Sequence, residues 1–299
     1  IRNIYVFILL LLISSFTLTG CKERKLPHPV ILPLVFTTST NGNIYPCGCR
    51  VPLGGISERG HQINLMRVKY PGLLVLDNGY SLWGVNYLVE KSNGKVIVES
   101  MNQMGYRAMN FRTTDLAFYN ASELKKIQEL AQFDFLSCNI TLKEESINLK
   151  KFVIYEVLGV KIAVTGVSEF YERAKDKFEY QKPEYALKEI LPDMIKKSDY
   201  VIVLSGLDFR GSSNLARMLR GIDLIISAPQ ILPVLKPKKI NETIIVTALK
   251  DGKSIGFIQV GFNIDRENTD YKFKTINIRE GMLKDKKIMN ILKKYQLEK

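Results

Sequence analysis

Short apolar runs alternate with amphipathic stretches along most of this chain. Continuous apolar segments at 31–38, 73–77 and 200–205 are bounded by turn residues, a pattern that predicts strands buried on both faces. Further strands are expected at 108–111, 135–140 and 223–227, and helices at 54–68, 96–104, 121–132, 184–197, 212–220 and 283–295. Strands that alternate with helices in this way predict an α/β fold with mixed sheets in one domain.

Two pairs of strand-like segments surround turn dipeptides in the second half of the chain. Leu158-Gly159 separates 152–157 from 160–167, and Asp251-Gly252 separates 243–249 from 254–262. Because a short glycine-containing turn between apolar runs is typical of a β-hairpin, we expect a hairpin at both places.

The first residues have the features of an export signal. Arg2 is followed by an apolar run at 4–13 and by Leu-Thr-Gly-Cys, which ends at Cys21. The run is about half the roughly 20 residues that a membrane-spanning helix needs. The last four residues resemble the lipobox of bacterial lipoproteins, which implies a signal peptide at 1–20, lipid on Cys21 and a charged tether over 21–30. A lysine directly after the cysteine resembles lipoproteins sorted to the outer membrane of Gram-negative bacteria.

The charge balance changes the expected partners more than the expected fold. The net charge is +13, and removal of residues 1–20 takes away one positive charge and leaves +12. Such a chain attracts anionic lipid, anionic polymers or acidic proteins. Nucleic acid is not an expected partner, because the lysines are scattered and neither a zinc-finger nor a helix-turn-helix signature is present. The basic segment 281–299 is expected to form a solvated helix, with membrane or partner docking as the alternative.

Three cysteines remain besides Cys21. Cys47 and Cys49 form a Cys-Gly-Cys motif, and Cys138 lies in an apolar segment. An odd number leaves at least one thiol unpaired or paired with another chain. We expect a structural disulfide from Cys47 or Cys49 to Cys138; redox chemistry, or a soft-metal site with Cys138 as third ligand, are the alternatives.

The order of motifs at 36–59 is more specific than any one of them. Phe-Thr-Thr-Ser-Thr-Asn-Gly-Asn at 36–43 precedes Tyr-Pro-Cys-Gly-Cys at 45–49 and Leu-Gly-Gly-Ile-Ser-Glu-Arg at 53–59. This order resembles the calcineurin-like metallophosphoesterases, in particular their exported 5′-nucleotidase-like branch. Segments at 76–80, 104–115, 201–206, 221–230 and 252–262 resemble later parts of that family in the same order. The resemblance covers 31–280 and implies an αββα sandwich of two mixed sheets flanked by helices.

The family's reaction requires two metal ions, held by Asp, His and Asn, and a metal-bound hydroxide that attacks phosphorus. The matching positions hold Ser39 and Asn41 for the first Asp and its partner His, Tyr80 for the bridging Asp, Thr113 for Asn, Thr114 for the catalytic His, and Gly206 for the next His. The terminal loop at 227–230 has no histidine, and the two histidines of the chain, His28 and His61, match no ligand position. Because catalytic dications need carboxylate and imidazole ligands, these residues argue against the activity.

Anion binding is a weaker hypothesis for the same region. Gly54-Gly55 at a helix start offers free N–H groups, and Arg112 lies beside the threonines that replace the metal ligands. Entry into a helix is the simpler explanation of the two glycines.

The sequence therefore predicts a lipid-anchored, catalytically inactive metallophosphoesterase-like protein without metal or cofactor. It would act in binding or assembly at the cell envelope, on the membrane through its lipid and with another envelope protein. One alternative is a divergent metal-dependent phosphoesterase whose relocated metal site uses Asp77, Asp115 or Asp208. Another is a thiol or electron-transfer accessory protein that works through Cys47 and Cys49.

Overall fold

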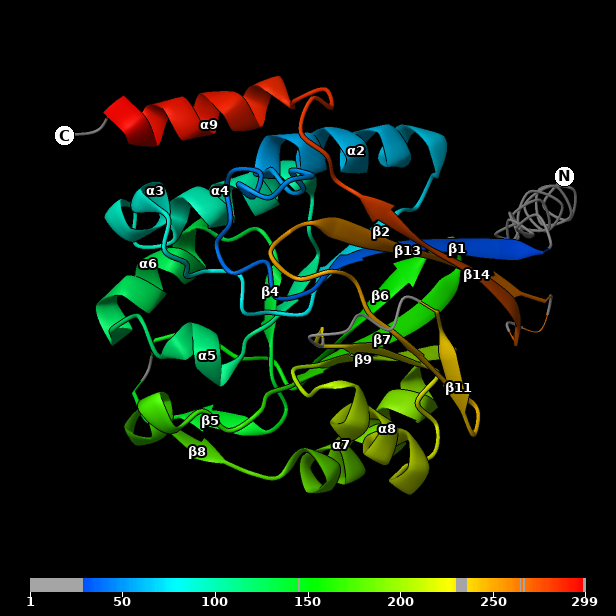
Figure 1. The fold of residues 1–299 in the computed structure, drawn as a ribbon. Coiled ribbons are helices and arrows are strands. Elements are labelled where there is room, and N and C mark those ends of the chain that lie inside the picture. Colours follow the sequence, from blue (N-terminus) through cyan, green and yellow to red (C-terminus); the bar gives the residue numbers. More distant parts are fainter. Residues whose placement is uncertain (1–28, 145, 230–235, 264, 266, 298–299) are drawn as a thin grey trace, which may run out of the picture.

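Two six-stranded sheets pack face to face, and helices cover the outer face of each (Figure 1). The computed structural model describes residues 29–144, 146–229, 236–263, 265 and 267–297. The first sheet contains, in spatial order, β14 (Asn268–Asn277), β13 (Ser254–Phe262), β1 (Val30–Thr37), β2 (Leu74–Asp77), β3 (Ala108–Asn110) and β4 (Asp134–Leu136). The second contains β11 (Lys238–Ile240), β12 (Thr243–Val246), β10 (Leu224–Ser227), β9 (Tyr200–Ser205), β7 (Val160–Val167) and β6 (Phe152–Val157). This arrangement confirms the expected αββα sandwich.

The helices divide between the two outer faces. On the first sheet lie α2 (Ile56–Lys69), α3 (Tyr87–Lys91), α4 (Lys95–Met104), α6 (Ala121–Leu130) and α9 (Lys286–Leu297), and on the second lie α7 (Pro183–Lys197) and α8 (Phe209–Met218). The short α5 (Thr113–Leu116) follows β3, and a 3-10 helix at Glu172–Lys177 precedes β8 (Phe178–Tyr180), which pairs with β5 (Ile140–Leu142). Among the helices of the described chain, none is long and apolar enough to cross a membrane.

The core has three layers because both faces of the central strands are covered. On β1, Leu34 and Phe36 pack between the two sheets, whereas Val35 packs under the helices of the first sheet. On β9, Ile202 faces the other sheet and Val203 faces α7 and α8. Alternate residues therefore enter different apolar layers, which explains the continuous apolar runs. Truncation of one of these large side chains to alanine is expected to cost about 2–5 kcal/mol.

One expected hairpin is confirmed and the other is wrong. β6 and β7 pair antiparallel across Leu158 and Gly159, both at positive φ. β12 and β13 lie in different sheets, and the turn at Asp251 and Gly252 carries the chain from one sheet to the other. β13 pairs with β1 and with β14 instead, so its partners are distant or later segments that local sequence does not reveal.

Two further expectations need comment. The segment 135–140 is split into β4 and β5, with Cys138 in the connection between them. The signal peptide, the lipidation at Cys21 and most of the tether fall on residues 1–28, which lie outside the described residues, so they stay predictions.

Candidate functional site

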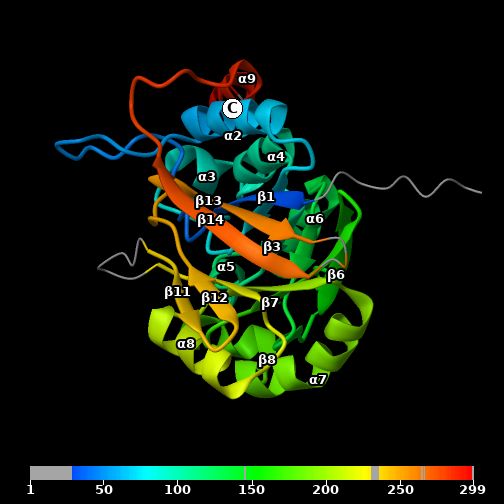
Figure 2. The same ribbon diagram turned by 90° about the vertical axis from the view of Figure 1, so that its right-hand side faces the viewer.

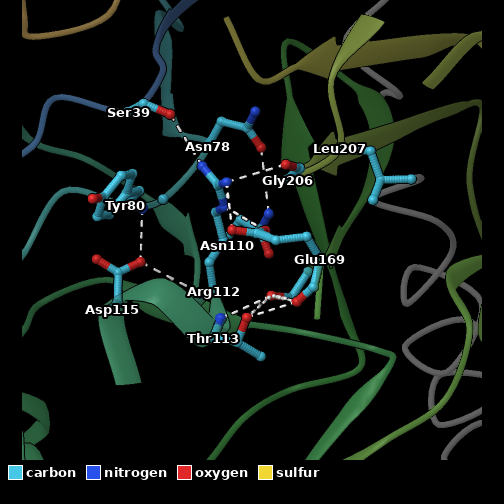
Figure 3. A network of polar contacts seen from close by, with 12 residues as sticks. Ser39, Asn78, Tyr80, Asn110, Arg112, Thr113, Asp115, Glu169, Gly206 and Leu207 are labelled. Carbon is cyan, nitrogen blue, oxygen red and sulfur yellow. Dashed lines mark hydrogen bonds and ion pairs between the residues drawn. The ribbon is translucent and has the colours of Figure 1, made fainter. Parts of the chain in front are cut away.

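The positions that match the family's ligands lie after the carboxyl ends of four strands. Ser39 and Asn41 follow β1, Tyr80 follows β2, the two threonines begin α5 after β3, and Gly206 follows β9. The backbone ties the first two loops together, because Ser39 N–H donates to Gly79 O at 3.1 Å and Asn41 N–H donates to Tyr80 O at 2.9 Å. Ligand sites of α/β proteins form at such strand ends, so the architecture of a site is present (Figure 3).

The guanidinium of Arg112 lies in the middle of these strand ends, which together are called the cleft (Figure 3). It forms a bidentate ion pair with Glu169, at 2.9 Å from Nε and 2.7 Å from Nη2. Nη1 donates to Ser39 Oγ at 3.0 Å, Nη2 also donates to Gly206 O at 3.1 Å, and the ring of Tyr80 lies 5.6 Å from the guanidinium carbon. One cation thus contacts three of the six positions that match metal ligands.

The ion pair is removed from most of the solvent. Arg112 is 6% exposed, and its side chain and that of Glu169 are 7% and 23% exposed. Burial alone would lower the pKa of Arg112, but Glu169 and, more weakly, Asp115 raise it, so the guanidinium stays charged. A buried charge needs its partner, because breaking such a pair leaves an uncompensated charge in a low dielectric. Every nitrogen of the Arg112 guanidinium already donates within the chain, which argues against the hypothesis that this residue binds an external anion.

Gly206 is the position where the ion pair and a metal ligand exclude each other. A Cβ atom there would lie 2.5 Å from a carboxylate oxygen of Glu169 and 2.8 Å from Nε of Arg112. Any side chain at 206, including a metal-binding imidazole, therefore requires the ion pair to move. Sequence analysis missed Glu169, although it lies two residues after the end of the apolar strand β7, and therefore at a strand end beside the cleft.

Below the ion pair, two buried asparagines tie the sheets together. Asn78 Nδ2 donates to Ser205 O at 2.8 Å, and Asn110 Nδ2 donates to Val167 O at 2.9 Å and Leu204 O at 3.0 Å. These amides come from the first sheet and the carbonyl groups from the second. They satisfy backbone groups at strand ends that would otherwise be buried without a partner.

Three positions that match metal ligands have left-handed backbones. Ser39, Asn41 and Tyr80 have φ of 44°, 53° and 56°. Such conformations cost about 1 kcal/mol or more for residues other than glycine and persist only where the surroundings hold them. Here Asp251 contributes, since its N–H donates to Ser39 O at 2.9 Å and its carboxylate accepts from Asn41 Nδ2 at 2.6 Å. The cleft thus has a specialised backbone without the family's side chains.

The three carboxylates of the relocated-metal hypothesis are used within the protein. Asp115 accepts the N–H groups of Tyr80 and Ser81 at 2.7 and 2.9 Å, and Asp77 accepts from Gly79 N–H and the Ser81 hydroxyl, both at 2.8 Å. Asp208 accepts from the N–H of residue 211 as the N-cap of α8. Burial raises the pKa of Asp115 to about 6, against the opposing effect of these N–H groups and Arg112. Asp77 and Asp115 thus hold the same loop after β2, and Asp208 caps a helix.

The residues of the cleft do not fit two metal ions. The side chains present offer hydroxyl and amide groups, and the carboxylate of Glu169 is already paired. A dication would lie against the guanidinium of Arg112, whose charge repels it. Among the described residues, no three His, Cys, Asp or Glu side chains group in a way that could hold a metal ion.

The start of α2 is occupied from within the chain. A Cβ at Gly55 would lie 2.3 Å from a carboxylate oxygen of Glu58, so this side chain folds back over the helix start. Glu58 itself is 1% exposed. The two glycines therefore let a buried helix begin, as the simpler explanation held, and the carboxylate covers the place that an anion would take.

The three described cysteines lie in different environments and are all free. Cys47 and Cys49 lie in the loop before α2, where Cys47 Sγ accepts the N–H of Leu53 at 3.4 Å. Cys138 is buried in the apolar layer between the second sheet and α7, and burial raises its pKa to about 12. The expected disulfide to Cys138 is wrong, and so is a metal site with this residue as third ligand, because its thiol faces the core.

The fold and the strand-end cleft together define a protein with the 5′-nucleotidase-like metallophosphoesterase fold. No family model matches the chain. The 5′-nucleotidase precursor from Thermus thermophilus superposes with a TM-score of 0.80 at 20% identity, over 89% of this chain and 58% of that one. Calcineurin-like phosphoesterase YfkN from Bacillus subtilis superposes with a TM-score of 0.75 at 19% identity, over 90% of this chain and 97% of that one.

A sequence relationship points the same way. The snake venom 5′-nucleotidase of Gloydius brevicauda is 22% identical over 183 residues, which are 58% of this chain and 31% of the venom enzyme. The chain thus spans about a third of the length of this curated relative. At these identities the similarity establishes the fold, and the activity has to be argued from the cleft.

Proposed function

We propose that this chain is a lipid-anchored, catalytically inactive protein of the metallophosphoesterase fold that acts by binding at the cell envelope. The observation that carries the proposal is the Arg112–Glu169 ion pair in the cleft. It places a fixed positive charge against Ser39 and Gly206, two positions that match metal ligands. On this proposal, a protein cation takes the place that the resemblance assigns to metal.

Hydrolysis tests the inactive cleft directly. The purified full chain should release no phosphate from AMP, and no p-nitrophenol from p-nitrophenyl phosphate, above a no-protein blank in the presence of Mn²⁺, Zn²⁺ or Mg²⁺. A 5′-nucleotidase assayed beside it shows that the conditions permit turnover. Metal-dependent turnover that survives repurification would contradict the proposal and favour the divergent phosphoesterase.

The lipid anchor would join the folded body far from the cleft. The tether leads into β1 at Val30, and Ser39 follows the other end of this strand. Eight residues of strand span about 26 Å, so the cleft and the loops around it would face away from the anchored end. This orientation would leave the cleft side open to another envelope protein and supports a binding role.

Labelling and fractionation test the anchor. Radiolabelled palmitate should enter the wild-type chain and remain with the membrane fraction, and Cys21→Ser should lose both label and membrane association. Cys47→Ser is the matched control, because it removes a cysteine outside the lipobox and should keep the label. Label retained in Cys21→Ser would overturn lipidation at this residue. Crosslinking in intact envelopes, with and without Cys21, then identifies the protein partner.

A further inference from the structure

The loop at 44–54 projects from the body (Figure 2) and carries Cys47 and Cys49. Its base is fixed, because Cys47 N–H donates to Leu53 O at 2.8 Å and Gly54 N–H donates to Ile278 O at 2.9 Å. Its tip is open, since no atom lies within 4 Å of a Cβ placed on Gly48 and Cys49 is exposed. A rigid base with an accessible tip presents both sulfur atoms to a large molecule.

The two thiols differ in their surroundings. Cys47 Sγ accepts the N–H of Leu53 at 3.4 Å, and Cys49 follows two residues later at the exposed tip. The neighbouring thiol of Cys49 and, less strongly, the N–H of Leu53 lower the pKa of Cys47. The proximity of Cys47 raises the pKa of Cys49. Lys253, which pairs with Asp251 at 3.0 Å, adds positive charge near both sulfur atoms. The thiolate form is thus favoured more at Cys47 than at Cys49.

This pairing is the arrangement that thiol–disulfide exchange requires. The thiolate is the attacking species, and a second thiol close by resolves the mixed disulfide. Tyr45 and Val51, on either side of the cysteines, are 48% and 63% exposed, so the tip also offers apolar surface to a polypeptide. Cys138, buried elsewhere, takes no part.

We propose that Cys47 and Cys49 form a thiol–disulfide exchange site for disulfide-bonded polypeptides. Cys47 as thiolate attacks one sulfur of the substrate disulfide, and a Cys47–substrate bond replaces the substrate S–S bond while the other substrate sulfur leaves and takes a proton. Cys49 then loses its proton to solvent and attacks Cys47 Sγ, which releases the second substrate thiol. The loop loses two electrons and the substrate gains two. The oxidised loop can return them by the reverse exchange with a dithiol polypeptide.

Variants of the reduced full chain test the site, with insulin as the disulfide-bonded probe. Wild-type protein should separate the insulin chains, and its own mass should fall by that of two hydrogen atoms. Cys47→Ser should lower the rate of insulin reduction by about 100-fold or more. Cys49→Ser should accumulate a mixed disulfide at Cys47, because the resolving thiol is missing. Cys138→Ser should behave as wild type. Unchanged unfolding midpoints verify that all three variants are folded.

Two outcomes would overturn the proposal. The first is an insulin rate for wild type equal to that of Cys47→Ser, with no adduct trapped by Cys49→Ser. The second is reaction with glutathione disulfide as fast as with insulin, which would show two ordinary exposed thiols without preference for a polypeptide. Neither outcome depends on metal binding or hydrolysis, so this proposal and the proposal of an inactive cleft are tested independently of each other.

Discussion

The cleft interior and the Cys-Gly-Cys loop differ in which of their side chains are available to another molecule. In the interior, Arg112, Glu169 and Asp115 direct their charged groups at one another or at backbone groups. In the loop, the thiols of Cys47 and Cys49 are accessible. On the two proposals made here, reactive chemistry belongs to the exposed loop, whereas the charged groups of the cleft are used within the protein.

Removal of the central cation should have the largest effect on this comparison. Arg112→Ala leaves Glu169 partly buried without its partner, so the free energy of unfolding should fall by about 4 kcal/mol. Lys197→Ala, which breaks an exposed pair with Asp193, is the control and should change stability by about 0.5 kcal/mol or less. Urea unfolding measures both. Equal, small losses would show that the cleft is no more tightly organised than the surface.

The pH dependence of stability tests Asp115. Its pKa is about 6 in the folded chain against 3.8 as the ordinary value. Between these values the folded state holds a proton that the unfolded state has lost, so stability falls as pH rises, and the fall ends above about pH 6. The shift of about two units corresponds to at most about 3 kcal/mol.

Asp115→Asn provides the matched variant for this pH effect. Its neutral side chain does not titrate. The amide NH2 group faces backbone N–H donors, so the variant is less stable by an amount that does not change with pH. The free energy of unfolding of wild type minus that of Asp115→Asn should therefore fall between about pH 4 and about pH 7, as measured by urea unfolding. Parallel curves over this range would contradict the assigned protonation.

Two glycines offer a direct contrast between interior and loop. Gly206→Ala places a methyl group against Glu169 and Arg112 and should cost about 2 kcal/mol. Gly48→Ala meets open space and should change stability by about 0.5 kcal/mol or less. In an Arg112→Ala background the cost of Gly206→Ala should shrink, because the two sites are coupled. If the losses in free energy of unfolding for Gly206→Ala and Arg112→Ala simply add in the double variant, the ion pair does not restrict position 206.

The smallest effect is expected from the loop cysteines. Cys47→Ser and Cys49→Ser should each change the free energy of unfolding by about 0.5 kcal/mol or less, with or without reductant. If either cysteine were joined to Cys138, its removal would instead cost about 2–4 kcal/mol under non-reducing conditions only. Unfolding curves with and without dithiothreitol separate these results.

Local sequence predicted the strands and their burial well, because β1, β2 and β9 are apolar on both faces and end at turn residues. It failed where the partner of a segment is remote. Asp251 and Gly252 form the expected turn, but the pairing of β13 with β1 joins segments from opposite ends of the chain, so a local hairpin was the wrong inference.

The candidate site shows the same limit. The sequence predicted which ligands are missing, because absent side chains can be counted along matched motifs. It did not identify what replaces them, since Arg112 and Glu169 are 57 residues apart and meet only when two sheets pack. Cys138 was misplaced for a related reason: its apolar segment contains two short strands, and the residue lies between them, against the core.

Metal content tests the central claim most directly. The purified full chain should be equilibrated with Mn²⁺, Zn²⁺ or Fe²⁺, desalted, and analysed by inductively coupled plasma mass spectrometry, with a 5′-nucleotidase treated in parallel. Because Arg112 and Glu169 take up the cleft, the chain should retain less than about 0.1 metal ion per molecule. One or two tightly held ions per chain, lost on substitution of cleft residues, would contradict the account.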